Sequence, residues 1–461
     1  MLIKEPVAFT QPKQLKYLII LLDFSIFIAA VYNILYFYNY LYSLNTMNSI
    51  SFDDNLKTTH KLPPIPPVLS YTKEELDLAI KNLNLPTWSR SYEECNSSKS
   101  EVTCSQIIQA WRSIDKWKTG IEKTKIENRS YIRINHYNNG VGNRIGMDVS
   151  MLLLAMMTNK TIVVEGKYIQ NGAVVNNRGN AFGYAYPVVD MNETYLSILS
   201  DEKRKPEINI NTFEGWFETD FERFRNNDKT LSLEVLMFAS MIYANAQMSA
   251  FARKNFGLHA VYFLTNFLIK VPKKNYKYIK EEIYDKIPKN VYVFGVHIRF
   301  QEPGHFFSYS IENNIKGIVP FLNHNMKKRP TVFAFSSDSK DMEDAFRGYF
   351  GNRVITTSTI KKPDFDHASA LVDILFLMGA NKCLLTYRST FSFLIMSSTA
   401  KRGYFLEKES GAIFKVSNSQ VGAISMLFHY YDNHDWQTSR RFVLLDKNEE
   451  SLRYFFNYFM I

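Results

Sequence analysis

The chain has 461 residues, of which 46% are hydrophobic and 15% aromatic. That length is enough for two α/β domains with appendages, because single domains typically run to about 100 to 200 residues. The formal net charge of +10 is compatible with an anionic ligand, an anionic membrane surface or nucleic acid. No run of Lys and Arg is interleaved with stacking aromatic residues, so a nucleic acid partner is not expected.

An apolar segment covers residues 17–38. At about 1.5 Å per residue, a helix of that length would span a hydrocarbon core about 30 Å thick. Lysines precede the segment, and no Lys or Arg follows it until Lys57, so the positive-inside rule places residues 1–16 in the cytosol. The pattern favours an uncleaved signal anchor over a cleaved signal peptide or a buried core helix, which predicts a type II membrane protein.

Residues 39–88 are predicted to form a stem. They are mostly polar and include Pro63-Pro64-Ile65-Pro66-Pro67, which favours an extended polyproline conformation. A short helix is expected within the stem at residues 74–85.

Only three cysteines occur. Cys95 and Cys104 flank a polar loop, which predicts a disulfide in an oxidising compartment, whereas Cys383 lies in an apolar strand pattern and is expected to be a buried thiol. No Cys and His spacing indicates zinc, so no metal site is expected. Sequons for N-glycosylation agree with a lumenal location, and they lie at Asn96, Asn128, Asn159 and Asn192.

The N-terminal half of the folded part is assigned to residues 89–285. A strand beginning at Tyr131 enters Gly140-Val141-Gly142-Asn143-Arg144, and an apolar run at residues 147–157 and a second strand at residues 161–165 follow. The backbone N–H groups of such a turn and the following helix N-terminus are suited to cradle an anion. The alternative is a turn that only connects a strand to a helix.

The C-terminal half is assigned to residues 286–430, with residues 431–461 as a C-terminal segment. Strand and helix patterns alternate after residue 291, which predicts a parallel sheet covered on both faces. The first of these strands is followed by Arg299, at the carboxyl edge where such sheets bind ligands. A guanidinium suits bidentate phosphate contacts, although a surface ion pair is the alternative role.

Three stretches in this order resemble a known family. They are Gly140-Val141-Gly142-Asn143-Arg144, then Gly295-Val296-His297-Ile298-Arg299 with Pro303-Gly304-His305-Phe306, then Ser389-Thr390-Phe391-Ser392. Together with the anchor they resemble the plant xyloglucan α-1,2-fucosyltransferase family. More distantly, they resemble the superfamily that includes the α-1,6 and protein O-fucosyltransferases. The resemblance covers about residues 130–408 and implies a GT-B fold, in which two Rossmann-like α/β halves face each other.

The resemblance also implies a donor site for GDP-fucose without a metal ion or other cofactor. Arg299 would hold the donor pyrophosphate, and the loop carrying Gly140, Gly142, Asn143 and Arg144 would approach from the other half. Residues 389–392 (Ser389, Thr390, Phe391 and Ser392) would lie at a helix N-terminus beside the phosphates, where hydroxyls, N–H groups and the helix dipole favour negative charge.

Two strand-end residues, Ser336 and Asp338, lie where the superfamily contacts the nucleoside. The alternative for Asp338 is to cap the helix that begins near Lys340. His297 and His367 are near the expected site, where a structural role is the alternative to a catalytic one. Glu302 is the nearest carboxylate to act as a base, and a solvated loop glutamate is its alternative.

This chain departs from the plant pattern at two places. Ser392 stands where glycine is usual, and Tyr387-Arg388 replaces smaller or Trp-containing sequences, so the acceptor is not inherited from the resemblance. Arg388 is a candidate second cation near the phosphates. The single Asp-x-Asp triplet, Asp364-Phe365-Asp366, is interpreted as the cap of a helix beginning near residue 367 rather than a metal motif.

The expected function is metal-independent, inverting transfer of fucose from GDP-fucose to a glycan hydroxyl, with galactose-containing acceptors expected in cell wall or glycan biosynthesis. The resemblance and the anchor together imply a Golgi membrane protein with its catalytic domain in the lumen. One alternative is a Golgi sulfotransferase, although the glycine turn lacks the Lys or Arg pattern of a phosphate loop. The other is a non-catalytic lumenal protein that binds glycans.

Overall fold

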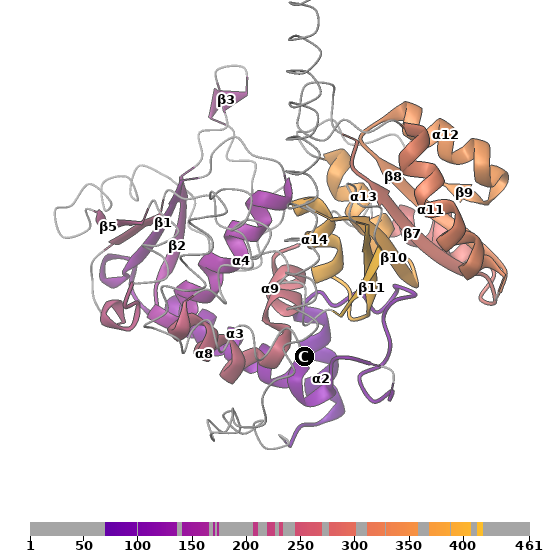
Figure 1. The fold of residues 1–461 in the computed structure, drawn as a ribbon. Helices are drawn as coiled ribbons and strands as arrows, with labels where there is room; N and C mark the ends of the chain where they lie inside the picture. The colour runs from indigo at the N-terminus through magenta and orange to yellow at the C-terminus, as the bar shows by residue number, and fades with distance from the viewer. Residues whose placement is uncertain are drawn as a thin grey trace, which may run out of the picture. The chain divides into compact units, whose positions relative to one another are not determined.

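The computed structural model describes residues 70–98, 100–135, 141–165, 169–170, 173–174, 206–210, 219–225, 230–233, 245–269, 276–300, 311–327, 329–357, 368–387, 389–406 and 413–417 (Figure 1). The chain divides into the units Met1–Pro64 and Ile65–Ile461, and all described residues belong to the second. The expected cytosolic tail, the anchor and the C-terminal segment lie outside the described residues. Within the described ranges, no helix combines the length and apolar character needed to cross a membrane.

The N-terminal half contains a four-stranded parallel sheet in the order β2-β1-β6-β5. Its strands are β1 (Tyr131–Asn135), β2 (Thr161–Glu165), β5 (Pro206–Ile210) and β6 (Thr230–Leu233), and β3 (Ile169–Gln170) pairs with β4 (Ala173–Val174) separately. The helices are α2 (Lys73–Asn82), α3 (Cys104–Lys123), α4 (Val141–Thr158), α8 (Ala246–Phe256) and α9 (Ala260–Leu268). The predicted succession of strand, helix and strand at residues 131–165 is confirmed.

The C-terminal half contains a six-stranded sheet in the order β12-β11-β10-β7-β8-β9. All neighbours are parallel except the edge strand β12, which is antiparallel to β11. The strands are β7 (Tyr292–Ile298), β8 (Thr331–Ser337), β9 (Val354–Ile355), β10 (Lys382–Thr386), β11 (Gly403–Leu406) and β12 (Ile413–Val416). The helices are α11 (Ile311–Met326), α12 (Lys340–Phe350), α13 (Ala368–Met378) and α14 (Thr390–Ser397). The expectation of an α/β fold with two mainly parallel sheets is confirmed.

Short helical turns complete the described elements. They are η2 (Ile126–Asn128), η4 (Glu222–Phe224), η6 (Gly257–His259), η7 (Tyr278–Ile283), η8 (Tyr284–Lys286) and η9 (Gly351–Arg353).

Strand β7 lies in the middle of its sheet and is buried from Val293 to Ile298. Gly295 allows α13 and β10 to pack closely against it, because a Cβ there would lie 2.7 Å from Sγ of Cys383 in β10 and 3.4 Å from Cδ2 of Leu377 in α13. Cys383 is 4% exposed, which confirms the predicted buried thiol, and burial raises its pKa to about 12. The thiol therefore remains protonated and unreactive at neutral pH.

The folded part begins within the range that we assigned to the stem. Helix α2 is capped by Thr72, whose Oγ1 accepts a hydrogen bond from the Glu75 N–H at 3.2 Å. Its residue Ala79 and the following Leu83 are fully buried. The expected stem of residues 39–88 is therefore too long, because these apolar side chains join the core.

The segment after α2 is bonded to the C-terminal half. Ser91 Oγ donates to the Met378 carbonyl at 3.0 Å, and Arg90 Nη1 donates to the Val291 carbonyl at 2.6 Å. These bonds satisfy the carbonyl groups of Met378 at the end of α13 and of Val291 just before β7. Residues 89–91 therefore contribute to the C-terminal half, although the chain order assigns them to the N-terminal one.

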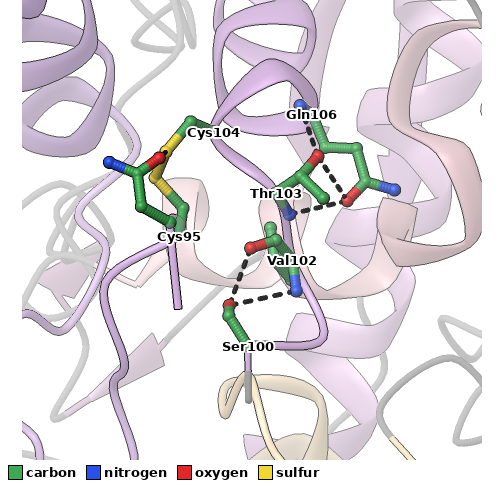
Figure 2. Close-up of a disulfide and its surroundings, with 7 residues drawn as sticks. Cys95, Ser100, Val102, Thr103, Cys104 and Gln106 are labelled. Atoms are coloured by element: carbon green, nitrogen blue, oxygen red, sulfur yellow. Dashed lines mark hydrogen bonds between the residues drawn. A yellow bond between two sulfur atoms is a disulfide. The ribbon is translucent and has the colours of Figure 1, made fainter. Parts of the chain in front are cut away.

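The predicted disulfide between Cys95 and Cys104 is present (Figure 2). Cys104 is the first residue of α3, and the preceding Thr103 forms a capping box with Gln106: each side chain accepts from the other residue's backbone N–H. A bridge that closes so short a loop stabilises the fold by about 2 to 3 kcal/mol. It holds the loop at the start of the helix.

Candidate active site

The carboxyl ends of β7 and β10 lie side by side and are joined through Thr386. This last residue of β10 donates its hydroxyl to the His297 carbonyl at 2.9 Å, and the same oxygen accepts the backbone N–H of Arg299 at 2.9 Å. The backbone of Arg299 is therefore fixed just beyond the end of β7. Its side chain is half exposed at the edge where open α/β sheets bind ligands.

Arg299 forms an ion pair with Asp338, which follows β8. The Nε to Oδ2 distance is 3.1 Å, and the other carboxylate oxygen, Oδ1, accepts the Phe300 N–H at 2.5 Å. The surface ion pair considered for Arg299 is therefore present. An exposed pair of this kind contributes only about 0 to 1 kcal/mol, which is less than a charge-assisted bond from a guanidinium to a phosphate contributes.

Asp338 does not cap α12, contrary to one of the two roles that its position suggested. The N-cap is Ser339, whose Oγ accepts the Met342 N–H at 3.3 Å. Because both carboxylate oxygens of Asp338 bind the segment after β7, its neighbour provides the cap. Asp338 thus orients Arg299 and the backbone that follows it.

His297 is buried and connects β7 to α14. Its Nδ1 lies 2.8 Å from Ser392 Oγ, and its ring centre lies 4.8 Å from that of Phe391. Ser392 is fully buried, so the hydroxyl that distinguishes this chain from the plant pattern has a buried partner. These contacts hold the first turn of α14 against the end of β7.

Helix α14 begins at the same edge of the sheet. Ser389 is its N-cap and is buried, with Oγ accepting the Ser392 N–H at 3.4 Å. Residues Thr390 and Phe391 follow in the first turn, where backbone N–H groups have no partner inside the helix. The positive end of this helix dipole therefore lies beside the carboxyl ends of β7 and β10.

The N-terminal glycine motif reaches the same helix end. A Cβ on Gly142 would lie 2.5 Å from the Thr390 carbonyl carbon, 2.6 Å from the Phe391 nitrogen and 2.7 Å from the Thr390 oxygen. Since all three are backbone atoms, only glycine permits this approach. The N-termini of α4 and α14, which come from the two halves of the chain, are therefore in direct contact, and two positive helix ends converge.

The glycine motif itself differs from the expected loop. Helix α4 begins at Val141, so Gly142, Asn143 and Arg144 belong to its first turn rather than to a turn before it. The apolar run after them continues this helix to Thr158. The residues thus remain at a helix N-terminus, one turn further into the helix than the sequence indicated.

Ser336, the other predicted nucleoside contact, is buried near the end of β8. Its Oγ donates to Asp373 Oδ2 at 3.0 Å, and Thr357 Oγ1 donates to the other oxygen of that carboxylate. Sequence reasoning missed Asp373 as well as Thr386. The signal for Asp373 was a single carboxylate inside the apolar sequence of α13.

Several predicted site residues lie outside the described residues. They are Gly140, Glu302, His367 and Arg388. The triplet Asp364-Phe365-Asp366, which was interpreted as a helix cap, also lies outside them. Over the ranges that the structure describes, no group of three or more His, Cys, Asp or Glu side chains is placed to hold a metal ion.

No protein family model matches the chain, and no curated protein matches it. Similar solved structures include a mutant of Arabidopsis thaliana FUT1 in complex with GDP, 10% identical over 77% of this chain and 85% of that one, with a TM-score of 0.47. NodZ α-1,6-fucosyltransferase soaked with GDP-fucose is 15% identical over 63% and 99% of the two chains, with a TM-score of 0.39. POFUT1 in complex with GDP-fucose is 12% identical over 60% and 95%, with a TM-score of 0.37.

These structural neighbours are fucosyltransferases solved with GDP or GDP-fucose.

Proposed function

We propose that this chain is a glycosyltransferase that transfers fucose from GDP-fucose to a hydroxyl of a galactose-containing glycan, with inversion and without a metal ion. The observation that carries the proposal is the contact between Gly142 and the first turn of α14. It brings two helix N-termini together beside the carboxyl end of β7, where Arg299 is anchored through Thr386. The ordered motifs that resemble the fucosyltransferases support GDP-fucose as the donor.

The proposed mechanism follows from charge. An inverting transfer develops positive character on the sugar and negative charge on the departing diphosphate. The first-turn N–H groups of α14, the N-terminus of α4 and the Arg299 guanidinium would stabilise that negative charge. By the resemblance, Arg144 and Arg388 would add cations, and Glu302 is the candidate base for the acceptor hydroxyl.

The ion pair with Asp338 fits this role for Arg299. A charge-assisted bond from a guanidinium to phosphate contributes about 1.5 to 3 kcal/mol, which exceeds the about 0 to 1 kcal/mol of an exposed ion pair. A diphosphate that arrives at the edge of the sheet would therefore compete successfully for the guanidinium. Asp338 would keep the side chain near its working position until the donor binds.

The donor and the metal dependence are tested together. Purified full-length protein should transfer fucose from GDP-fucose in EDTA and prefer it to GDP-mannose and UDP-galactose, with a mixture of galactose-ended glycans as acceptors. Raising the salt concentration should weaken donor binding, because salt screens the arginine and phosphate charges. Strict dependence on manganese, or preference for the uridine donor, would contradict the mechanism and the family resemblance. Binding of GDP-fucose without turnover would favour the glycan-binding alternative.

We also propose that the protein is a single-pass type II protein of the Golgi membrane, with residues 17–38 as the anchor. The apolar segment with lysines only on its N-terminal side supports this orientation. The disulfide between Cys95 and Cys104 supports an oxidising compartment for the folded part.

This topology predicts that the exposed Asn96 is glycosylated in microsomes and that a C-terminal tag resists protease until detergent is added. An Asn96→Gln variant is the control for the glycan at that site. A C-terminal tag that is digested without detergent would show the opposite orientation.

A further inference from the structure

A cavity of about 1030 Å³ lies at the amino edge of the C-terminal sheet. It is lined by Tyr292 at the start of β7 and by Lys382 at the start of β10. Because these strands are parallel, their starts share the edge opposite to the one that carries Arg299. The cavity is therefore separate from the proposed donor site.

The lining of this cavity is strongly cationic. Its charged residues are the cations Lys289, Arg329, Lys382, Lys401, Arg402 and Lys415 and the carboxylates Glu93 and Glu101. Lys401 pairs with Glu93, and Arg402 pairs with Glu101 at 2.9 Å. Across the described part of the chain, no carboxylate forms an ion pair with the other four cations, so the cavity carries an excess of positive charge.

Lys382 shows the effect of this crowding. It is half-buried, and its pKa is lowered first by burial and then by the neighbouring charges of Lys415, Arg329, Lys401 and Arg402. The central carbon of the Arg329 guanidinium lies 3.4 Å from the centre of the Tyr292 ring, a cation–π contact between two residues of the cavity wall. Such repulsion destabilises the unliganded protein, and a bound anion would relieve it.

The loop closed by the disulfide forms part of the wall. Glu93, Ser98 and Glu101 all come from the segment around Cys95–Cys104, and the two glutamates fix it to Lys401 and Arg402. The wall is thus preorganised by a covalent bond and by ion pairs at both ends of the segment. Ser98 and Asn290 add neutral polar groups that suit the oxygens of a sugar or an ester.

We propose that this cavity binds a small polyanion that carries at least two phosphate or sulfate groups. A volume of about 1030 Å³ accommodates such a molecule, whereas a membrane surface cannot enter a concave site. Nucleic acid is disfavoured because the lining aromatic ring, Tyr292, is already covered by Arg329. The cations that contact the anion are Lys382 and Lys415, with Arg329 on the wall.

Calorimetric titration of the full-length protein tests this site at an ionic strength of about 0.15 M. The two probes are inorganic tripolyphosphate and sucrose octasulfate, which separate a phosphate ligand from a sulfated one. Replacing both Lys382 and Lys415 by glutamine should weaken the binding of the tighter probe by about a hundredfold. Each lost charge-assisted contact corresponds to about a tenfold loss of affinity. The control removes two exposed lysines of α3, as Lys116→Gln with Lys123→Gln, and should change the affinity less than about twofold.

The proposal is wrong if neither probe binds, or if the cavity variant and the control variant bind the probes equally well.

The melting temperature of the cavity variant without ligand should stay constant or rise, because like-charge repulsion is removed. A clear fall would indicate that the lysines are structural and would overturn the site. GDP-fucose turnover should be unchanged in the cavity variant. Tripolyphosphate should bind to Arg299→Lys, in which donor turnover is reduced, with the same affinity as to the unchanged protein. These outcomes separate this site from the proposed function.

Discussion

Replacing Gly142 by alanine is expected to lower GDP-fucose turnover by about a hundredfold. The added Cβ would lie 2.5 Å from the Thr390 carbonyl carbon and 2.6 Å from the Phe391 nitrogen. Backbone atoms of a helix cannot move aside as a flexible side chain can, so the two helix N-termini must separate. A misplacement of about 1 Å near the reacting groups costs about a hundredfold in rate.

The same substitution should also lower the free energy of unfolding by about 1 to 3 kcal/mol, the usual effect of overpacking. Measuring kcat/KM for GDP-fucose together with urea unfolding separates the two effects, because the unfolding data report how much folded protein the assay contains. The matched controls are Gly317→Ala in α11 and Gly348→Ala in α12, where an added Cβ meets nothing within 4 Å. Alanine there should leave turnover unchanged and stabilise the helix by about 0.5 to 1 kcal/mol. Normal turnover in Gly142→Ala would show that the contact between α4 and α14 does not matter for the reaction.

Replacing Arg299 by lysine is expected to reduce kcat/KM by about tenfold to a hundredfold or more. Lysine keeps the charge but loses the planar fork that makes two parallel bonds to a phosphate. One lost charge-assisted bond corresponds to about 1.5 to 3 kcal/mol of transition-state free energy. The free energy of unfolding should change by less than about 1 kcal/mol, because the pair between Arg299 and Asp338 is half exposed.

Arg112→Lys is the matched control for Arg299→Lys. Arg112 also holds a carboxylate with two nitrogens, Nε at 2.7 Å and Nη2 at 2.9 Å from the two oxygens of Glu75, but it lies on the surface of α3. The Arg112→Lys variant should therefore have a normal kcat/KM for GDP-fucose. Steady-state kinetics that give kcat/KM for GDP-fucose decide the question, and a near-normal kcat/KM of Arg299→Lys would remove Arg299 from the site.

Local sequence patterns were sufficient to predict that strands and helices alternate after residue 291. Strand β8 ends at Ser337 and α12 begins at Lys340, close to the predicted limits, because a continuous apolar run followed by polar and capping residues leaves few alternatives. The choice of cap for α12 depends on tertiary contacts. Asp338 and Ser339 are both good N-caps, and the tertiary contacts with Arg299 and Phe300 engage Asp338 so that Ser339 takes the cap.

The sequence also could not show where the folded part begins. Helix α2 is short and mostly polar, and its few apolar residues matter only because a core is present to receive Ala79 and Leu83. The local composition of such a segment favours a stem, but its packing against residues far away in the sequence makes it part of the folded domain.

The sequence by itself determined the alternation of strands and helices, the disulfide, the buried thiol of Cys383 and the position of Arg299 at a strand end, because these depend on neighbours close in the chain. Only the tertiary structure decided which distant residues meet. The approach of Gly142 to Thr390, the bond from His297 to Ser392 and the cationic cavity at the opposite sheet edge all join segments that are far apart in sequence. Periodicity specifies which face of an element is buried, but partners are selected by the packing of whole helices and strands against one another.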